Sequence, residues 1–498
     1  MTNRTLTLRS GSMAVETAIA RKRRLGVNAE HEHYKWWALS CTSLGMLLAT
    51  INSGTLIIAL PDLERALHTS ILVLVWVILA YMISSTVLVL FAGRLSDLFG
   101  RKTAYVLGFV LFALASLGAG FAGGGTELIV WRVLQGIGGA FLFANSAALV
   151  TDAFPKEQLG LAMGTNTMVA AIGLVIGPVL GGALVALSWQ WVFWFNVPLA
   201  LLGSLWAWLI LRELAKPDRV RGYDVPGVTV FVLGLTGLVF GLSRGGLNGW
   251  TDPWTIAGIL AGVVLLPLFV LIERHHRAPM LDLSIFENRL FAAATGAAFI
   301  NGLSRFALLF LFVFYFQGVK GQDPITAGIE LAPMAIGMLI ASPIAGVYAD
   351  RRGSRMLSAA GMAVSAIGLA GMTLLGVHTA YAWSALWLFV VGVGSGMFNS
   401  PNTAAMMGTV PTYRRGIAAG ARTMLQNTGA VISIAFVLAI VTSSVDKDTL
   451  FKIFSGVTTG LSDATLEPFV ANMHTALWVL AATSVFGGFI CLLRPKGD

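Results

Sequence analysis

Long apolar stretches alternate with short polar ones along almost the whole chain of 498 residues. A membrane-spanning helix needs about 20 apolar residues, because the hydrocarbon core is about 30 Å thick and a helix rises about 1.5 Å per residue. Fourteen stretches are long enough, near 36–61, 71–92, 104–122, 127–150, 160–187, 191–211, 225–243, 254–273, 290–317, 325–349, 356–376, 380–408, 416–443 and 471–493. The pattern predicts an all-helical protein that crosses the membrane many times.

The composition supports this interpretation. Hydrophobic residues make up 56% of the chain and charged residues only 11%, whereas about a quarter of a soluble protein is charged. The 56 glycines suit close packing of helices in lipid. Cys41 and Cys491 lie in apolar segments near opposite ends of the chain. Two such cysteines indicate neither a disulfide framework nor a metal cluster, and we expect no metal and no cofactor.

The distribution of positive charge predicts the orientation. With the N-terminus inside, most of the 33 Lys and Arg residues fall in inside segments, and the outside segments contain only Arg65, Arg244, Lys320, Lys447 and Lys452. This asymmetry follows the positive-inside rule. It predicts that both termini are cytoplasmic in a bacterial inner membrane, and it explains the net charge of +9 without nucleic acid as a partner.

Two pairs of similar segments indicate an internal duplication. GRLSDLFGRK (93–102) and GVYADRRGSR (346–355) share the pattern Gly, Asp, Gly and a final basic residue, 253 positions apart. GIGGA (136–140) and GVGSG (392–396) are 256 positions apart. Both copies of the first segment fall on the inside, so the repeats run parallel. Parallel halves are typical of one class of secondary transporter, whose substrate site lies near mid-membrane between the halves.

The duplication predicts the domain organisation. A half of six helices accounts for the first six and the last six apolar stretches, and the seventh and eighth stretches are then an insertion. The predicted parts are a basic cytoplasmic tail (1–35), the first half (36–212), two inserted helices with linkers (213–289), and the second half (290–498) with an external loop near 444–470.

Three motifs resemble those of the major facilitator superfamily. GRLSDLFGRK resembles its signature between helices 2 and 3. LIVWRVLQGIGGA (128–140), with Arg132, Gln135 and Gly136, resembles its fourth-helix motif. GLVIGPVLGG (173–182) resembles its fifth-helix antiporter motif, through Gly173, Gly177, Pro178, Gly181 and Gly182. With fourteen helices, the chain is similar to the fourteen-helix branch of the drug:H+ antiporters, which implies a monomer with the major-facilitator fold.

The resemblance implies that the first motif is a latch on the cytoplasmic side. Gly93 and Gly100 permit a tight turn, and Asp97 can accept hydrogen bonds at a helix N-terminus, where the helix dipole favours an anion. The family implies that Asp97 and Arg101, beside Lys102, hold the halves together while the outside is open. Asp350 repeats the position in the second half. The alternative is a positively charged loop that only sets the topology.

Polar residues within the apolar stretches are candidates for function, because charge in a membrane is costly. Asn52 and Arg132 are predicted at similar depths and could face a central cavity. The resemblance implies that Arg132 tunes proton coupling; the alternative is a structural arginine bonded to backbone carbonyls. In the related antiporters an Asp usually stands where this chain has Asn52. An amide cannot titrate, so a proton site on the first helix and a preference for cationic drugs are both in doubt.

Acidic residues are scarce inside the membrane. Glu330 and Asp152 are, with Arg132, the candidates for proton coupling. Glu330 could pair with Arg305, or Arg305 could bind an anionic or zwitterionic head group; the sequence leaves both open. The full set of candidates for lining a substrate cavity is Asn52, Tyr81, Gln135, Asn166, Arg305, Phe306, Asn399 and Asn402.

These observations favour an exporter of lipophilic small molecules that works by alternating access and exchanges substrate for protons. The alternative is a facilitator, or a lipid or metabolite transporter, without proton coupling on the first helix. A membrane sensor or enzyme is disfavoured, because the sequence contains no phosphate-binding loop after a strand, no metal-ligand spacing and no nucleophile–base pair.

Overall fold

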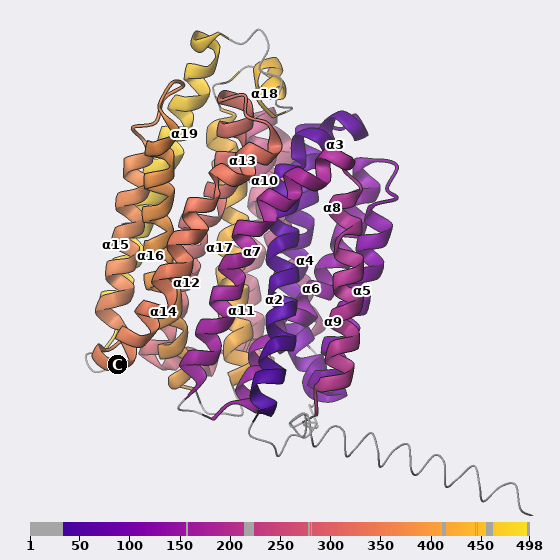
Figure 1. Ribbon diagram of the computed structural model, residues 1–498, viewed down its shortest axis with the longest axis vertical. Coiled ribbons are helices and arrows are strands. Elements are labelled where there is room, and N and C mark those ends of the chain that lie inside the picture. The colour runs from indigo at the N-terminus through magenta and orange to yellow at the C-terminus, as the bar shows by residue number, and fades with distance from the viewer. Residues whose placement is uncertain are drawn as a thin grey trace, which may run out of the picture.

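The structure is a computed structural model that describes residues 33–155, 158–213, 224–276, 279, 281–410, 415–443, 445, 447–454 and 462–495. Every regular element in these residues is a helix, and most run roughly parallel to one axis (Figure 1). The first half contains α2 (Tyr34–Ile58), α3 (Leu60–Leu67), α4 (Ile71–Phe99), α5 (Arg101–Ala119), α6 (Gly125–Ala153), α7 (Leu159–Leu187), α8 (Trp191–Trp194) and α9 (Asn196–Ile210).

The rest of the chain forms an inserted helix pair and a second half. The pair is α10 (Val225–Asn248) and α11 (Pro253–His275). The second half contains η2 (Leu283–Glu287), α12 (Arg289–Phe314), η3 (Tyr315–Val319), α13 (Pro324–Glu330), α14 (Ala332–Arg352), α15 (Arg355–Met372), α16 (Tyr381–Gly408), α17 (Arg415–Val441), α18 (Lys447–Phe454) and α19 (Asp463–Leu492).

The helices confirm the predicted fold class. Thirteen of the described helical segments are long and apolar enough to cross a membrane, and the 29-residue α7 supplies the fourteenth. The main difference is at the end of the chain, where α19 begins at Asp463 instead of near 471. The predicted loop near 444–470 is therefore partly helical, since it also contains α18. Hydropathy missed this first part of α19 because polar residues such as Glu467 lie in it.

Several helices start at a side chain that the sequence places just before a proline. Asp252 accepts a hydrogen bond from the backbone N–H of Thr255 at the start of α11, and Asp323 accepts two from the start of α13. In both helices the proline lies in the first turn, where its missing N–H costs nothing. The side-chain caps satisfy N–H groups that would otherwise lack partners at the helix ends.

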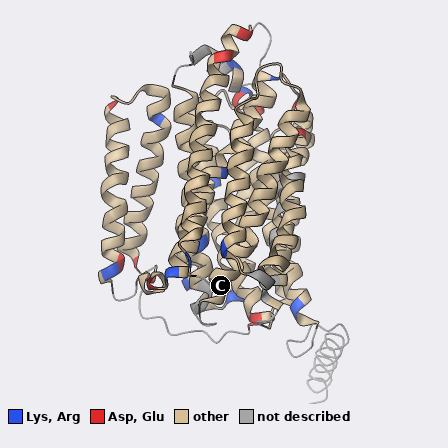
Figure 2. Ribbon diagram, turned by 90° about the vertical axis from the view of Figure 1, so that its left-hand side faces the viewer, with Lys and Arg blue, Asp and Glu red and all other residues tan. Residues whose placement is uncertain are grey.

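The two halves meet along two helix pairs that the duplication relates to each other. The second span of each half packs against the fifth span of the other: α4 against α17, and α14 with α13 against α7. The inserted helices α10 and α11 pack mainly against each other, and α10 also contacts α4 and α17. They correspond to the helix pair that stands beside the bundle in Figure 2. The insertion therefore covers one of the two seams between the halves.

Charged side chains gather at the two ends of the bundle, with few at mid-height (Figure 2). We call the end with the first residues of α2 and the last of α19 the termini side, and the opposite end, with α3, α13 and α18, the α18 side (Figure 1). This distribution follows from the high cost of placing charge in hydrocarbon. The few charged groups at mid-height are therefore the ones to examine for function.

Candidate functional site

A cavity of about 260 Å³ lies between the two halves. Its walls come from α2, α4, α6 and α7 of the first half and from α12, α14, α16 and α17 of the second. Five of the predicted cavity residues line it: Tyr81, Asn166, Arg305, Phe306 and Asn399. Much of the remaining surface is apolar and adaptable, with Met46, Met82, Met163, Met338, Met407, Phe143 and Leu309. The cavity is thus suited to an amphipathic molecule.

Three predicted cavity residues lie elsewhere. Asn52, Gln135 and Asn402 are at most 1% exposed and do not line the cavity. Each turns toward neighbouring helices of its own half. Sequence depth alone predicted their height in the membrane, but the direction of a side chain around the helix depends on which helices pack against it.

Asn52 belongs to a buried network around Arg132 in the first half. The Arg132 Nε donates to the carbonyl of Val77 at 2.9 Å, and its guanidinium also bonds to the side-chain oxygens of Asn52 and Gln135. The guanidinium lies over the ring of Tyr81, 4.4 Å from its centroid. Gln135 in turn donates to Asn52 at 3.2 Å. Neutral oxygens and an aromatic face therefore surround this charge.

The Arg132 network resembles the structural alternative more closely than the prediction of a cavity-facing residue. Arg132 is 1% exposed and does not line the cavity. Tyr81 is the link between the two, because its ring carries the guanidinium and it also lines the cavity. A role of Arg132 in proton coupling stays a prediction.

A second arginine lines the cavity beside Arg305. Arg422 of α17 donates to the side-chain oxygen of Asn399 at 3.4 Å, and Gln426 donates to the same oxygen at 3.2 Å. Arg305 stacks on Phe306, 4.7 Å from the ring centroid. The two guanidinium groups are near enough to repel each other. Sequence reasoning placed Arg422 within a span but gave it no role; the cost of intramembrane charge was the signal that could have identified it.

Arg494 is a further buried arginine that the sequence counted only as a charge at the end of the chain. It is 1% exposed, donates to the hydroxyls of Ser354 and Ser358 at 3.4 Å, and bonds to the side-chain oxygen of Asn402. Asn402 also donates to the carbonyl of Ala294 at 3.1 Å. Asn402 thus links helices within the second half.

The predicted antiporter motif lies where the halves meet on the α18 side. Gly177 and Gly181 of α7 approach the backbone of α2, and a Cβ on Gly181 would lie 2.7 Å from the Cα of Thr55. One turn further along the chain, a Cβ on Gly182 would lie 2.7 Å from the Cα of Ile325 in α13. Pro178 is also at this contact, since a Cβ on Gly328 would lie 2.6 Å from its carbonyl oxygen. In this conformation α7 and α13 close the α18 side, and Gly173 continues the contact with α2 at Thr50.

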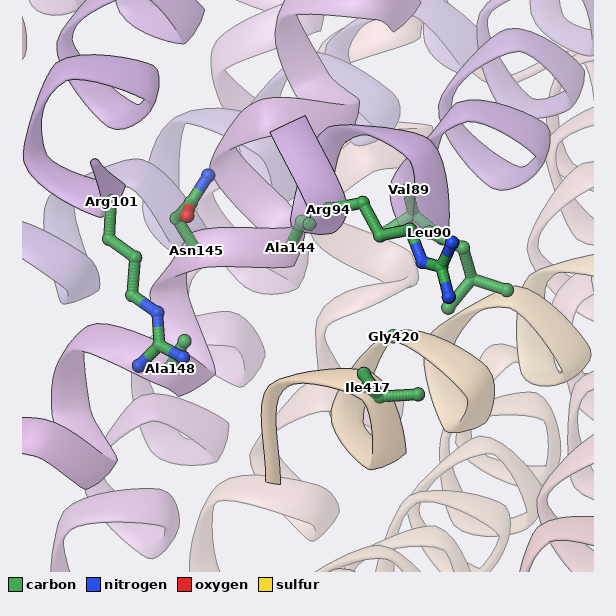
Figure 3. A pocket seen from close by; sticks show the side chains of 10 residues that line it. Val89, Leu90, Arg94, Arg101, Ala144, Asn145, Ala148, Ile417 and Gly420 are labelled. Atoms are coloured by element: carbon green, nitrogen blue, oxygen red, sulfur yellow. The ribbon is translucent and has the colours of Figure 1, made fainter. Parts of the chain in front are cut away.

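The predicted latch lies on the termini side, next to the other half. Figure 3 shows Leu90, Arg94 and Arg101 of the first half around a small cavity, with Ile417 and Gly420 of α17 on its other side. Gly93 also lines this cavity, whose volume of about 20 Å³ is room for about one water molecule. The side chains of Asp97 and Asp350 lie outside the described residues, so their predicted role as latch acids stays a prediction.

Two other acids contact the latch segment. Both carboxylate oxygens of Asp152 accept hydrogen bonds from Arg101, at 2.7 Å. Glu213 accepts from the backbone N–H groups of Arg101 and Lys102, at 2.8 and 3.1 Å, and so caps α5 where Gly100 adopts a φ of 93°. Asp152, predicted for proton coupling, thus has an ion-pair partner in the latch. Sequence reasoning missed Glu213, because it lies far away in the chain.

Glu330 is not paired with Arg305. It ends α13 on the α18 side and does not line the cavity that contains Arg305. The cation near Glu330 is Lys320. Burial lowers the pKa of the Lys320 amine and the Glu330 carboxylate opposes this shift; the amine donates to the carbonyl of Thr379 at 2.6 Å. The first of the two alternatives for Arg305, a pair with Glu330, is therefore absent from this conformation.

Two helical halves related by duplication, with an amphipathic cavity between them and a movable seam at each end, define a membrane transporter. No cluster of metal-ligating side chains is present in the part of the chain that the structure describes. The model of the Major Facilitator Superfamily matches residues 42–434. The chain belongs to this superfamily, and it is a transporter rather than an enzyme.

Named relatives place the chain in the drug-efflux branch. It is 32% identical over 400 residues to the multidrug resistance protein Stp of Mycobacterium tuberculosis, covering 80% of this chain and 74% of Stp. It is 26% identical to the riboflavin transporter RibZ of Clostridioides difficile, covering 91% of this chain and 96% of RibZ. The crystal structure of the human organic anion transporter MFSD10 has a similar fold, with a TM-score of 0.61 and 14% identity over 92% of this chain and 99% of that one.

Proposed function

We propose that this protein is a secondary active exporter of lipophilic and amphipathic small molecules, driven by the proton gradient. The observation that carries the proposal is the central cavity, because both halves line it and it combines polar groups with a flexible apolar wall. Methionine side chains adapt to ligands of different shape. The relationship to Stp, named as a multidrug resistance protein, supports the same direction of transport.

The proposed exporter lies in the bacterial inner membrane as a monomer, with its termini side toward the cytoplasm. The excess of Lys and Arg in the inside segments supports this orientation. In the described conformation the α18 side is closed by α7 and α13, and the cavity is lined by the termini-side parts of α6, α7, α16 and α17. This is the arrangement expected of a transporter ready to take substrate from the cytoplasmic side or the inner leaflet.

Proton coupling requires an acid that can change its protonation state during transport. Asn52 cannot do this, and the described residues that line the cavity include neither Asp nor Glu. Glu330 is the acid we propose as the proton carrier, because it lies close to the α7–α13 contact that must open on the α18 side. Protonation there would reduce its attraction to Lys320 and so could be linked to opening.

The second candidate is a facilitator or metabolite transporter without proton coupling. The absence of an acid among the described cavity residues and the amide at Asn52 favour this candidate. RibZ, named as a riboflavin transporter, shows that relatives of this length include proteins named for a metabolite.

The test uses purified protein in liposomes with an acidic interior and a trapped pH-sensitive dye. A lipophilic cation, a neutral lipophile and a lipophilic anion are added in turn, and protein-free liposomes serve as the control. Proton efflux that depends on protein and substrate supports the exporter, and its loss in Glu330→Gln places the proton at α13. Substrate movement without proton flux refutes antiport and supports the second candidate.

A further inference from the structure

We infer that the cavity selects molecules with an acidic group, such as a carboxylate, sulfonate or phosphate, on an apolar body. This inference names the substrate class of the transporter proposed above and rests on that proposal. It is carried by the two arginines of the second half, Arg305 and Arg422, which line the same cavity.

Arg305 has no counter-charge in the protein. Within the described residues its guanidinium makes no hydrogen bond or ion pair, its Nε is buried without a partner, and its recorded contact is with the ring of Phe306. The residue is only 7% exposed. An unpaired charge in such surroundings is costly, so a ligand that supplies the missing anion gains the interaction that the protein leaves open.

Arg422 strengthens this preference and fixes its position. Its Nε is also buried without a partner among the described residues, while one terminal nitrogen bonds to the neutral side chain of Asn399. Two guanidinium groups that repel each other both gain when an anion lies between them. Guanidinium groups bind carboxylates and phosphates with paired hydrogen bonds that are stronger than those between neutral groups.

The comparison with the other buried arginines shows that this arrangement is specific to the cavity. Arg132 and Arg494 are each 1% exposed and are surrounded by carbonyl, amide or hydroxyl oxygens of their own half. Those charges are solvated by the protein. The guanidinium of Arg305 instead borders an empty, partly apolar space that contains no described acidic side chain.

The remainder of the cavity matches an apolar body attached to the acidic group. The five methionines, Phe143 and Leu309 form the apolar walls, and small polar groups such as those of Ser53, Ser85 and Asn166 lie on the first half. A lipophilic cation would fill the same walls but would meet two positive charges without an acid, which is a repulsive element against it.

The direct test measures binding to the purified protein of two dyes of closely similar shape. One is the anion anilinonaphthalene sulfonate and the other is neutral phenylnaphthylamine; tetraphenylphosphonium is the cationic competitor. The variants are Arg305→Gln, Arg422→Gln and the double variant, with Arg65→Gln as the control, because Arg65 is an exposed arginine on α3 outside the cavity. Empty detergent micelles give the background for each dye.

We expect each Gln variant to weaken binding of the sulfonate about tenfold or more, since a hydrogen bond to a charged group contributes about 1.5–3 kcal/mol. Arg305→Lys should restore part of the loss. Binding of phenylnaphthylamine should stay within about twofold in all variants, which also shows that each variant is folded. Unchanged sulfonate binding in the double variant, or tighter binding of tetraphenylphosphonium than of the sulfonate to the unmodified protein, overturns the inference.

Two further measurements separate the sources of the acid and the fate of the two proposals. Displacement of the sulfonate dye by a short-chain phosphatidylglycerol, but not by the matching phosphatidylcholine, identifies a lipid head group as an acceptable acid; displacement by neither assigns the site to soluble amphiphiles. If the sulfonate binds as expected but liposomes transport none of the three probes, the proposed export function fails and the binding site stands. If liposomes transport the cation alone, export stands and the acidic substrate class fails.

Discussion

Replacing Asn52 by Asp tests whether the first half has kept a place for the acid that its relatives carry. The side-chain oxygen of Asn52 accepts from Gln135 at 3.2 Å and from Arg132 and Asn196 at 3.4 Å. Its Nδ2 is buried without a hydrogen-bond partner among the described residues. The site therefore offers three donors to this side chain and, within that part of the chain, no acceptor for its amide hydrogens.

The magnitude follows from two opposing terms. Asn52→Asp removes a buried donor without a partner, which costs about 1–3 kcal/mol in the unmodified protein, and places a carboxylate beside the Arg132 guanidinium. Desolvation of the carboxylate opposes both gains. We expect Asn52→Asp to be neutral or stabilising by about 1–2 kcal/mol. In an Arg132→Gln background the same carboxylate has no cation, and we expect a loss of about 3–5 kcal/mol, as when one member of a buried pair is removed.

The assay is a double-mutant cycle on thermal unfolding in detergent, with the two single variants, the double variant and the unmodified protein. An interaction free energy of about 3 kcal/mol or more between positions 52 and 132 supports the reasoning. Equal destabilisation by Asn52→Asp in both backgrounds would refute it, because the carboxylate would then gain nothing from Arg132. The same variant should also leave the pH dependence of transport unchanged near neutral pH, since a carboxylate beside a guanidinium stays ionised there.

Three further changes test the two ends of the bundle. Gly182→Ala places a Cβ 2.7 Å from the Cα of Ile325, so we expect the α18 side to open more often; a cysteine replacing the buried Ala327 should then react faster with an impermeant maleimide, and an unchanged rate would contradict the role of this contact. Glu213→Ala removes both side-chain hydrogen bonds at the start of α5 and should lower stability by about 1 kcal/mol, seen as a lower unfolding temperature, whereas Glu213→Gln, which keeps one acceptor oxygen, should lose less. Asp323→Ala removes the cap of α13 and should also cost about 1 kcal/mol. Because hydrogen bonds to its carboxylate lower the pKa of Asp323, this difference should be full above about pH 4 and disappear as the pH falls through the lowered pKa; a difference that grows on acidification would contradict it.

Periodicity predicted the bundle because lipid imposes simple rules on sequence. A span must be long and apolar, and positive charge is confined to particular loops. The duplication was visible because Gly93 and Gly346, like Asp97 and Asp350, keep their spacing in both halves. These features depend on residues that are close in the sequence or on a regular offset, so they can be found without a structure.

The site was only partly predictable because it depends on rotation around the helix axis. Tyr81 and Arg305 line the cavity as predicted, but Asn52 and Gln135 turn toward Arg132 inside the first half. A polar residue in a membrane helix can lie against another helix or against a cavity, and apolar neighbours on every side remove the amphipathic pattern that would distinguish the two. The mean moment of a buried membrane helix therefore carries little information on direction.

Partners that are distant in sequence account for the other differences. Asp152 was identified by its depth, but its ion pair with Arg101 joins the ends of two helices. Glu213 lies more than a hundred residues after the N–H groups that it caps. No local pattern encodes such contacts, because they exist only after the helices have packed. The sequence could show that Arg422 lies in a span, but not that it shares a cavity with Arg305.

The positions of Arg305 and Arg422 have a consequence for alternating access. The repeats relate the two seams between the halves, but both cavity arginines belong to the second half, on α12 and α17. These helices are in close contact, since a Cβ on Gly302 would clash with the backbone of Gln426, and one on Gly429 would lie 3.0 Å from the backbone nitrogen of Leu303. Two helices packed this closely move as one body.

An acidic group held by both arginines would therefore keep its contacts while the halves rock. The first half meets the same ligand mainly through Met46, Met82 and Met163 and through small hydroxyl and amide groups, whose contacts are weak and easily exchanged. Rocking of one half against the other, the usual form of alternating access in parallel-repeat transporters, would then move the first half past the apolar body without breaking the charged contacts. The asymmetry of charge between otherwise repeated halves thus separates two tasks, with the second half holding the ligand and the first half forming the sliding wall.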